Sequence, residues 1–214
     1  MFKGIQYENA LKVLHRVRDA GFQAFFVGGC VRDALLGKTP PDYDVATNAQ
    51  PDELIRLIKK TNKVIPVGKQ FGVIVVVEGQ TEVEVATFRA DGPYLDGRHP
   101  TNVTFTDYKG DVMRRDFTIN GLLYDPDKNE VIDLVGGQND LREKIIRTIG
   151  DPDARFKEDK LRMMRAIRFA CVLEFEIEPA TLESIRRMHS KIAQVSWERI
   201  SYELQKILVC RRRS

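Results

Sequence analysis

The way strand-like and helix-like segments are distributed along the chain limits its fold most strongly. Before about residue 138, short apolar runs of strand length, such as 24–27, 73–77 and 82–88, alternate with segments of helical periodicity. Glycine lies in the link between the last two runs, which predicts a hairpin. From about residue 150 onward, every segment is predicted to be helical. We therefore expect an α+β region with a mixed sheet, followed by an all-helical region.

Composition excludes several classes of protein. Hydrophobic residues make up 43% of the chain and charged residues 30%, which is typical of a folded domain rather than a disordered one. Cys30, Cys171 and Cys210 lack the spacing of a zinc site or a disulfide framework. Apolar runs are too short to cross a bilayer, and no signal-like segment opens the chain. We expect a cytoplasmic protein without a membrane partner or an obligatory protein partner.

Arginine is concentrated in the last third of the chain, although the net charge is only +3. A locally basic surface suits phosphates or nucleic acid. A solvated charged face is the ordinary explanation of such a helix, so the basic region alone does not identify a partner.

A glycine pair ends the first predicted strand. Gly28 and Gly29 follow the apolar residues 24–27 and precede a short predicted helix that carries Arg32 and Asp33. Glycine lets the backbone approach a phosphate closely, and free N–H groups at the start of a helix attract anions. A tight turn explains the pair better when it is taken alone; with Arg32 beside it, it is a candidate phosphate-binding turn.

Two aspartates come next, at the start of a predicted short strand. Asp42 and Asp44 are two residues apart, so their side chains project from the same face of that strand. Carboxylates this close repel each other, and a divalent cation removes that repulsion. Mg²⁺ is typically bound by one or two carboxylates together with substrate phosphates. An acidic turn after Pro40-Pro41 explains the pair equally well.

A third carboxylate is available in the second strand of the predicted hairpin. Glu82 and Glu84 lie on one face of that strand, and Val83 and Val85 lie on the other. Either glutamate could join the two aspartates. An edge strand with one solvated face accounts for the pattern just as well.

A polar segment at residues 114–120 lies beside an apolar run. Arg114 and Arg115 are suited to triphosphate oxygens, and Asp116 or Asn120 can bind a ribose hydroxyl. A helix capped by Asp116 is the alternative explanation.

The predicted helix after residue 158 combines acidic and basic residues. Arg162, Arg165 and Arg168 recur every third residue and form a polar arc at about 100° per residue, opposite an apolar arc that includes Ile167. Glu158 and Asp159 precede Arg162 by four and three residues, close enough to fix its guanidinium. A guanidinium held in this way can bind the Watson–Crick edge of a base as well as phosphate. In isolation, an ordinary amphipathic helix with salt bridges explains the pattern.

Together these segments resemble one family. In order and spacing, the set is similar to the class II tRNA nucleotidyltransferases (CCA-adding enzymes) and the related bacterial poly(A) polymerases of the DNA polymerase beta superfamily. The resemblance runs from about Phe25 to Leu208 and rests on the segments GGCVRD, DYD, RRDFTIN, EDKLRMMRAIRF and SWERISYEL.

The resemblance implies a nucleotidyltransferase head at residues 1–138 and a helical, nucleotide-selecting neck at residues 139–214. The body and tail domains of the family are expected to be absent. It also implies that Asp42 and Asp44 bind two Mg²⁺ ions, one lowering the pKa of the RNA 3′-hydroxyl and the other stabilising the triphosphate. Glu84 matches the third catalytic carboxylate. The loop at residues 91–102 corresponds to the flexible loop that switches the site from C to A.

The family pattern also implies roles for the remaining polar residues. Asp159 and Arg162 act as a protein template that hydrogen-bonds the incoming base. The other nucleotide-binding residues serve the triphosphate, the ribose or the template: Gly28, Gly29, Arg32, Asp33, Arg114, Arg115, Asp116, Asn120, Arg165 and Arg168.

The function expected from this resemblance is addition of C and/or A, from CTP and ATP, to the 3′ end of tRNA, with release of pyrophosphate and with Mg²⁺ as cofactor. An A-adding enzyme or a poly(A) polymerase uses the same chemistry. A catalytically silent RNA-binding module of the same fold is the alternative from another class, and Asp42, Asp44 and Arg162 count against it.

Overall fold

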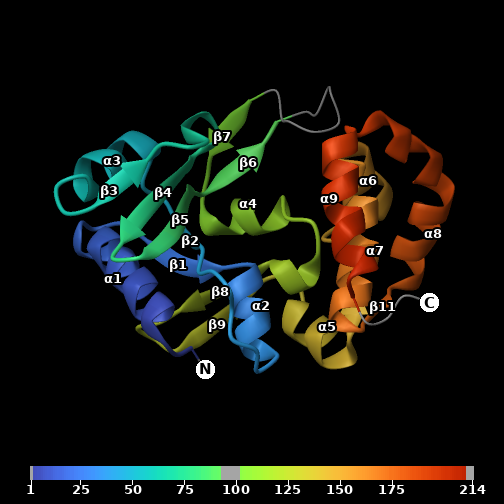
Figure 1. Cartoon of the computed structure of the whole chain (residues 1–214), viewed down its shortest axis with the longest axis horizontal. Helices are drawn as coiled ribbons and strands as arrows, with labels where there is room; N and C mark the ends of the chain where they lie inside the picture. The colour runs from blue at the N-terminus through green and yellow to red at the C-terminus, as the bar shows by residue number, and fades with distance from the viewer. Residues whose placement is uncertain (1, 93–101, 211–214) are drawn as a thin grey trace. The chain divides into compact units, whose positions relative to one another are not determined.

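The computed structural model describes residues 2–92 and 102–210, and the chain divides into two compact units (Figure 1). The first unit comprises Met1–Ala90, Val103–Arg114 and Asn120–Leu134. The second comprises Asp91–Asn102, Arg115–Ile119 and Val135–Ser214. Residues 93–101 of the predicted switching loop lie outside the described residues.

A seven-stranded mixed sheet forms the centre of the first unit. Neighbouring strands are antiparallel except β2 and β5, which are parallel, so the predicted mixed sheet is confirmed. The strands lie in the order β3 (Lys63–Ile65), β4 (Val73–Glu78), β5 (Thr81–Thr87), β2 (Val45–Thr47), β1 (Ala24–Val27), β8 (Leu122–Asp125) and β9 (Glu130–Asp133).

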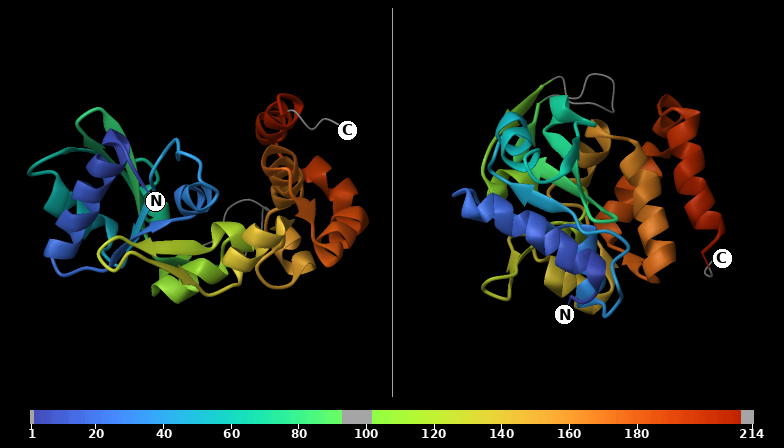
Figure 2. Two further views of the ribbon diagram at one scale, coloured as in Figure 1. Left: turned by 90° about the horizontal axis from the view of Figure 1, so that it is seen from below. Right: turned by 60° about the vertical axis from the view of Figure 1, so that its left-hand side comes forward.

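Helices cover this sheet (Figure 2). Helix α1 (Ile5–Asp19) packs on β1, β2, β4 and β5, because Ala10, Val13, Leu14 and Val17 form one buried stripe at helical spacing. Helix α2 (Gly29–Leu35) packs on β1 and β8, and α3 (Pro51–Ile58) packs on β3 and β4. The remaining short elements are η1 (Lys69–Phe71), α4 (Tyr108–Met113), η2 (Thr118–Asn120), and the two-stranded sheet of β6 (Arg89–Asp91) and β7 (Val103–Phe105).

The second unit is mainly helical, as predicted. Its elements are α5 (Gly137–Glu143), β10 (Ile145–Ile146), α6 (Pro152–Glu158), α7 (Leu161–Leu173), β11 (Glu176–Ile177), α8 (Pro179–Met188), η3 (His189–Gln194) and α9 (Trp197–Leu208). Helix α7 packs against α9, and α6 packs against α8.

One expectation about strands was wrong, and one alternative explanation is excluded. Glu176 and Ile177 form a strand, paired in parallel with Ile145 and Ile146, in the region where every segment was expected to be helical. Two residues are too few to show a period in the sequence. The hairpin of β4 and β5 is confirmed, with Gly79 at φ +61° in its two-residue turn. However, β5 lies between β4 and β2, so the edge-strand explanation for Glu82 and Glu84 does not hold.

In the part of the chain that the structure describes, none of the helices is both long enough and apolar enough to cross a membrane.

Candidate active site

The two aspartates of the D-x-D pair lie at the start of β2, beside the glycine turn. Val27, the last residue of β1, donates its N–H to the carbonyl of Asp44 at 3.0 Å. The register of β1 and β2 pairs Phe26 with Val45, which fixes the position of Asp44 along the sheet. Asp42 is exposed and Asp44 is half-buried. The backbone of the sheet therefore sets where this pair lies.

Tyr43, between the two aspartates, anchors this part of the chain. It is 2% exposed, and its ring lies 5.6–6.0 Å from those of Phe2, Tyr7 and Phe26. Because side chains alternate along an extended chain, burying Tyr43 directs Asp42 and Asp44 to the opposite side. Within the described residues the Tyr43 hydroxyl has no hydrogen-bond partner.

Glu84 lies on the strand next to the aspartates. β2 and β5 are parallel, with Val45 opposite Val85, so the same register places Glu84 beside Asp44 and on the same face. Glu82 and Glu84 are exposed, whereas Val83 and Val85 are fully buried. The two faces predicted for this strand are confirmed, and the sheet brings Asp42, Asp44 and Glu84 to one region.

The buried thiol of Cys30, on α2, lies near the two aspartates. Burial raises its pKa to about 12, and the negative charge of Asp44, with a smaller contribution from Asp42, acts in the same direction. The two carboxylates thus place negative charge near the start of α2. In the described ranges, no group of three or more His, Cys, Asp or Glu side chains is arranged to hold a metal ion. Two carboxylates on one face nevertheless fit a divalent cation whose other ligands are phosphate oxygens.

The glycine turn leads directly to Arg32. Gly28 has φ +72°, and its N–H donates to the carbonyl of Leu122 at the start of β8. Arg32 donates from Nη1 to Asn120 Oδ1 at 2.7 Å and from Nε to Asp33 Oδ1 at 2.8 Å. A Cβ placed on Gly29 would lie 3.6 Å from the Arg32 guanidinium. The predicted residues Gly28, Gly29, Arg32, Asp33 and Asn120 therefore lie together.

Arg114 is fixed by an aspartate that the sequence did not reveal. Its Nε and Nη2 donate to Asp111 Oδ1 at 2.9 and 2.7 Å, and Asp111 is 1% exposed. The backbone N–H of Arg89 donates to the same oxygen at 3.3 Å. Arg115 follows as a half-buried residue of the second unit.

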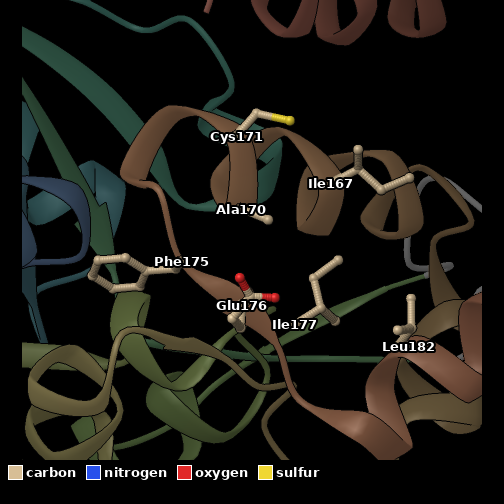
Figure 3. A pocket seen from close by; sticks show the side chains of 7 residues that line it. All are labelled: Ile167, Ala170, Cys171, Phe175, Glu176, Ile177 and Leu182. Carbon is tan, nitrogen blue, oxygen red and sulfur yellow. The ribbon is translucent and has the colours of Figure 1, made fainter. Parts of the chain in front are cut away.

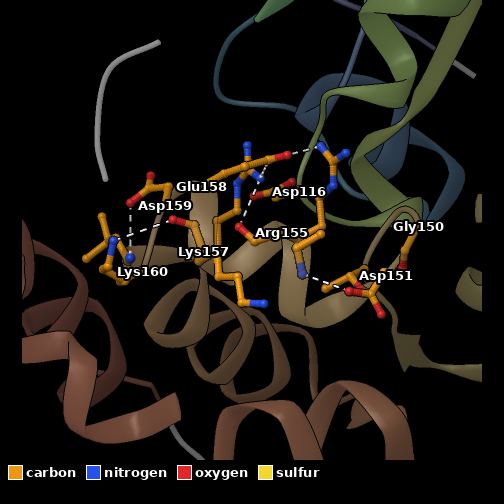
Figure 4. A network of polar contacts seen from close by, with 12 residues as sticks. Asp116, Gly150, Asp151, Arg155, Lys157, Glu158, Asp159 and Lys160 are labelled. Carbon is orange, nitrogen blue, oxygen red and sulfur yellow. Dashed lines mark hydrogen bonds and ion pairs between the residues drawn. The ribbon is translucent and has the colours of Figure 1, made fainter. Parts of the chain in front are cut away.

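In the second unit, Asp116 binds Arg165. Figure 4 shows Asp116 within a polar network that also includes Arg155 and Glu158 of α6. Asp116 Oδ2 accepts from Arg165 Nε and Nη2 at 2.8 and 2.6 Å, and Oδ1 accepts from the N–H of Phe117 at 2.8 Å. The carboxylate of Asp116 raises the pKa of the Arg165 guanidinium, so the arginine stays charged in this pair. This ion pair with Arg165 explains the aspartate at position 116 better than a helix-capping role does.

Arg162 is buried at the beginning of α7, with 8% exposure. It donates from Nη1 to Glu158 Oε2 at 2.5 Å and to the carbonyl of Arg155 at 3.2 Å. The predicted contact with Glu158 is thus confirmed. Asp159 is instead paired with Arg199 of α9, a partner that was not predicted.

The third arginine of α7 meets a buried glutamate. Arg168 Nε donates to Glu203 Oε2, and Arg165 Nη1 lies 3.8 Å from Glu203 Oε1. Glu203 is 2% exposed on α9, between Ile200 and Ile207 on one helical face. A carboxylate within an apolar stripe is the signal by which it could have been found.

The predicted division of α7 into a polar and an apolar arc was therefore wrong in part. Arg162 is buried, whereas Ile167 is 38% exposed. Arg162 shares the buried face of α7 with Ala166 and Phe169, and Glu158 pairs with it there. Arg165 and Arg168 are half-buried and pair with Asp116 and Glu203.

Two apolar cavities in the second unit do not suit a triphosphate. One, of about 230 Å³, is lined by Ile167, Ala170, Ile177 and Leu182, with Glu176 as its charged residue (Figure 3). The other, of about 570 Å³, lies between α7, η3 and the start of α9. Neither lining contains lysine or arginine, the cationic side chains that commonly bind phosphate oxygens.

Two profiles of known protein families together match most of the chain. The sequence profile described as "Poly A polymerase head domain" matches residues 24–147. A second profile, described as "Probable RNA and SrmB- binding site of polymerase A", matches residues 174–214.

Individual relatives agree with these matches. The chain is 46% identical over 205 residues to a CCA-adding enzyme of Pediococcus pentosaceus and 44% identical over 203 residues to one of Bacillus pumilus. The matched regions are 95% and 94% of this chain but 51% and 50% of those proteins. The chain therefore spans about half the length of the curated relatives it matches.

Solved structures show the same relationship. A crystal structure of the Bacillus stearothermophilus CCA-adding enzyme in complex with CTP matches with a TM-score of 0.88 and 38% identity, over 98% of this chain and 50% of that one. A tRNA nucleotidyltransferase complexed with a primer tRNA and an incoming ATP analog matches with a TM-score of 0.73 and 29% identity, over 92% of this chain and 56% of that one.

Proposed function

Because the chain belongs to the poly(A) polymerase head-domain family, we propose that it is a template-independent RNA nucleotidyltransferase. It adds C and A, from CTP and ATP, to the 3′ end of tRNA and releases pyrophosphate. The observation that carries this proposal is the carboxylate pair Asp42 and Asp44, which β2 places beside the Gly28-Gly29 turn. The names of the matched relatives, CCA-adding enzymes, favour addition of both bases over addition of A alone.

Membership in this family implies dependence on a divalent metal ion, and we propose that the ion is Mg²⁺. Asp42 and Asp44 would hold it, with Glu84 as the third acidic side chain of the region. When bound, Mg²⁺ lowers the pKa of the RNA 3′-hydroxyl and offsets the charge of the triphosphate. Carboxylate oxygens supply the hard ligands that Mg²⁺ prefers.

The residues around the glycine turn would bind the triphosphate and the sugar. The backbone of Gly28 and Gly29 leaves room for a phosphate, and Arg32, which binds Asn120 and Asp33, adds a positively charged guanidinium beside it. Arg114 and Arg115 add positive charge for the triphosphate. Asn120 and Asp116 are the proposed ribose-binding residues.

In the second unit, Asp159 and Arg162 would select the base. Cytosine and adenine both carry an exocyclic amino donor, whereas guanine and uracil carry a carbonyl acceptor at the equivalent place. A carboxylate can only accept, and a guanidinium can only donate. The pair therefore complements C and A and rejects G and U. Arg165 and Arg168 would support this template from the same helix.

We propose a nucleotidyltransferase head at residues 1–138 and a nucleotide-selecting neck at residues 139–214. We also propose a cytoplasmic location, with which the proposed substrates tRNA, CTP and ATP are consistent.

The test is nucleotide incorporation on three tRNAs, which end before the first C, before the second C and before the A. Labelled CTP or ATP is supplied separately with Mg²⁺. We expect CTP to be added to the first two substrates and ATP to the third. Incorporation of ATP alone, and only on the CC-ended tRNA, would indicate an A-adding enzyme. Long ATP runs on unrelated RNA would indicate poly(A) synthesis, and no incorporation at all would leave a silent RNA-binding module.

A further inference from the structure

Helix α9 contacts the proposed base-selecting residue Asp159 and the supporting residue Arg168 through two charged side chains. Arg199 and Glu203 are four residues apart and lie on the same face of the helix. Opposite charges at this spacing commonly pair with each other on a helix surface. Here each pairs with another part of the unit: Arg199 with Asp159, and Glu203 with Arg168.

The contact of Arg199 with Asp159 is bidentate. Arg199 Nη1 donates to Asp159 Oδ1 at 3.2 Å, and Nη2 donates to Oδ2 at 2.8 Å. The side chains of Arg199 and Asp159 are 22% and 14% exposed. A paired fork of this kind fixes the plane of a carboxylate as well as its distance.

Asp159 needs such a constraint because its backbone is not helical. It ends α6 with φ −140° and ψ 107°, in the extended link before α7. The N–H of Leu161 donates to Asp159 Oδ1 at 3.1 Å, which is a second tie. A carboxylate offers about four acceptor positions, and these three bonds leave capacity for one further donor.

We propose that Arg199 is a positioning residue that determines base specificity by holding Asp159 in one orientation. This inference rests on the proposed function of Asp159 as a base-reading residue. A fixed carboxylate accepts from the amino group of C or A and repels the carbonyl of U or G. A carboxylate that can rotate relieves that repulsion. Binding of U or G is then strengthened by more than binding of C or A is weakened.

The test compares CTP with UTP on a tRNA that ends before the first C. The preference is the ratio of the two kcat/KM values, measured for the parent chain, Arg199→Ala, Arg199→Lys, Asp159→Ala and the double variant. Arg186→Ala is the matched control, because Arg186 is an exposed arginine of the same unit whose ion pair is with Glu183. Thermal unfolding of each variant shows whether it is folded.

We expect Arg199→Ala to lower the preference for CTP by about tenfold or more, as misplacement of a binding group does. Lysine keeps the positive charge but lacks the paired donors of the guanidinium, so Arg199→Lys should keep part of the CTP preference. In the Asp159→Ala background, Arg199→Ala should change the preference by less than about twofold, because its effect passes through Asp159. Arg186→Ala should match the parent.

The inference is overturned if Asp159→Ala lowers the preference while Arg199→Ala leaves it unchanged, or if the effect of Arg199→Ala persists in full in the double variant. If Arg199→Ala does not fold, a parent-like preference in Arg199→Lys overturns it. Two other results would contradict the proposed function itself. In one, Asp159→Ala has the same CTP preference as the parent; in the other, the parent incorporates neither nucleotide.

Discussion

The acidic residues of the first unit and those of the second are held in place by different means. Asp44 is set by the register of β1 and β2, with its carbonyl hydrogen-bonded to Val27, and the buried ring of Tyr43 turns it outward. Asp159 lies in an extended link, and the side chain of Arg199 fixes it. In the first unit the backbone positions the carboxylate, whereas in the second unit a salt bridge does.

This difference predicts where substitutions have effects. Around Asp44, substitution of the reacting groups themselves should have the largest effects, since the register of β1 and β2 sets their position. Around α7, the partners of the arginines should be sensitive as well, because a buried arginine that loses its carboxylate is left uncompensated.

The largest effect is expected for Asp44→Ala. Loss of a proposed metal ligand removes several kcal/mol of transition-state stabilisation, or a rate loss of about a thousandfold or more. Single-turnover incorporation of labelled CTP measures this loss. Glu82→Ala is the control, an exposed glutamate two residues from Glu84 on the same strand, and its rate should stay within about twofold of the parent. Equal losses in both variants would show that overall charge, rather than a ligand, is what matters.

A smaller effect is expected for Glu203→Gln, which removes the charge between Arg168 and Arg165. Breaking a buried ion pair from one side costs about 3 kcal/mol, so urea unfolding should begin at a lower concentration. The matched control is Glu183→Gln on α8, whose side chain is 55% exposed beside Arg186 and Arg187. It should change the free energy of unfolding by less than about 1 kcal/mol. If both variants had the stability of the parent, the carboxylate of Glu203 would not hold the arginines.

Tyr43→Phe should stabilise the protein by about 1 kcal/mol, because it removes a buried hydroxyl without a partner in the described residues. Tyr124→Phe is the opposite case within the same aromatic cluster: its hydroxyl donates to Asn129 Oδ1 at 2.8 Å, and its loss should destabilise by a similar amount. Thermal unfolding of the two variants measures both signs. A loss of stability in Tyr43→Phe would contradict the arrangement described for β2.

The smallest effect is a pH dependence that arises from Cys30. Because folding raises the pKa of this thiol from 9.0 to about 12, the folded state keeps a proton that the unfolded state loses first. Its contribution to stability is fully present below pH 9 and is lost as the pH rises toward 12. Between pH 8 and pH 10 the parent should therefore lose about 1 kcal/mol more than Cys30→Ala. Parallel urea titrations of the two proteins measure this difference, and equal losses would contradict it.

Much of the fold could be predicted because its determinants are local. The buried stripe of α1, the hairpin of β4 and β5 and the alternation around Glu84 are all visible as periodic patterns. The two-residue strand at Glu176–Ile177 could not be predicted, since it exists only through its pairing with Ile145–Ile146.

The candidate site was predictable to different extents in the two units. The face shared by Asp42 and Asp44 follows from spacing alone. The pairing of Asp159 with Arg199, across forty sequence positions, depends on how α9 packs. Helical spacing predicted Glu158 as the partner of Arg162, but it did not predict that Arg162 would lie on the buried side of α7.

Nucleotide binding by two variants tests the proposed division of roles most directly. The dissociation constants of CTP and UTP are measured by equilibrium dialysis for the parent, Asp44→Asn and Asp159→Ala. We predict that Asp44→Asn keeps the parent's ratio of the two constants although it has lost turnover, and that Asp159→Ala brings the ratio close to one. A parent-like ratio in Asp159→Ala, or a ratio near one in Asp44→Asn, would contradict the assignment of chemistry to the first unit and base selection to the second.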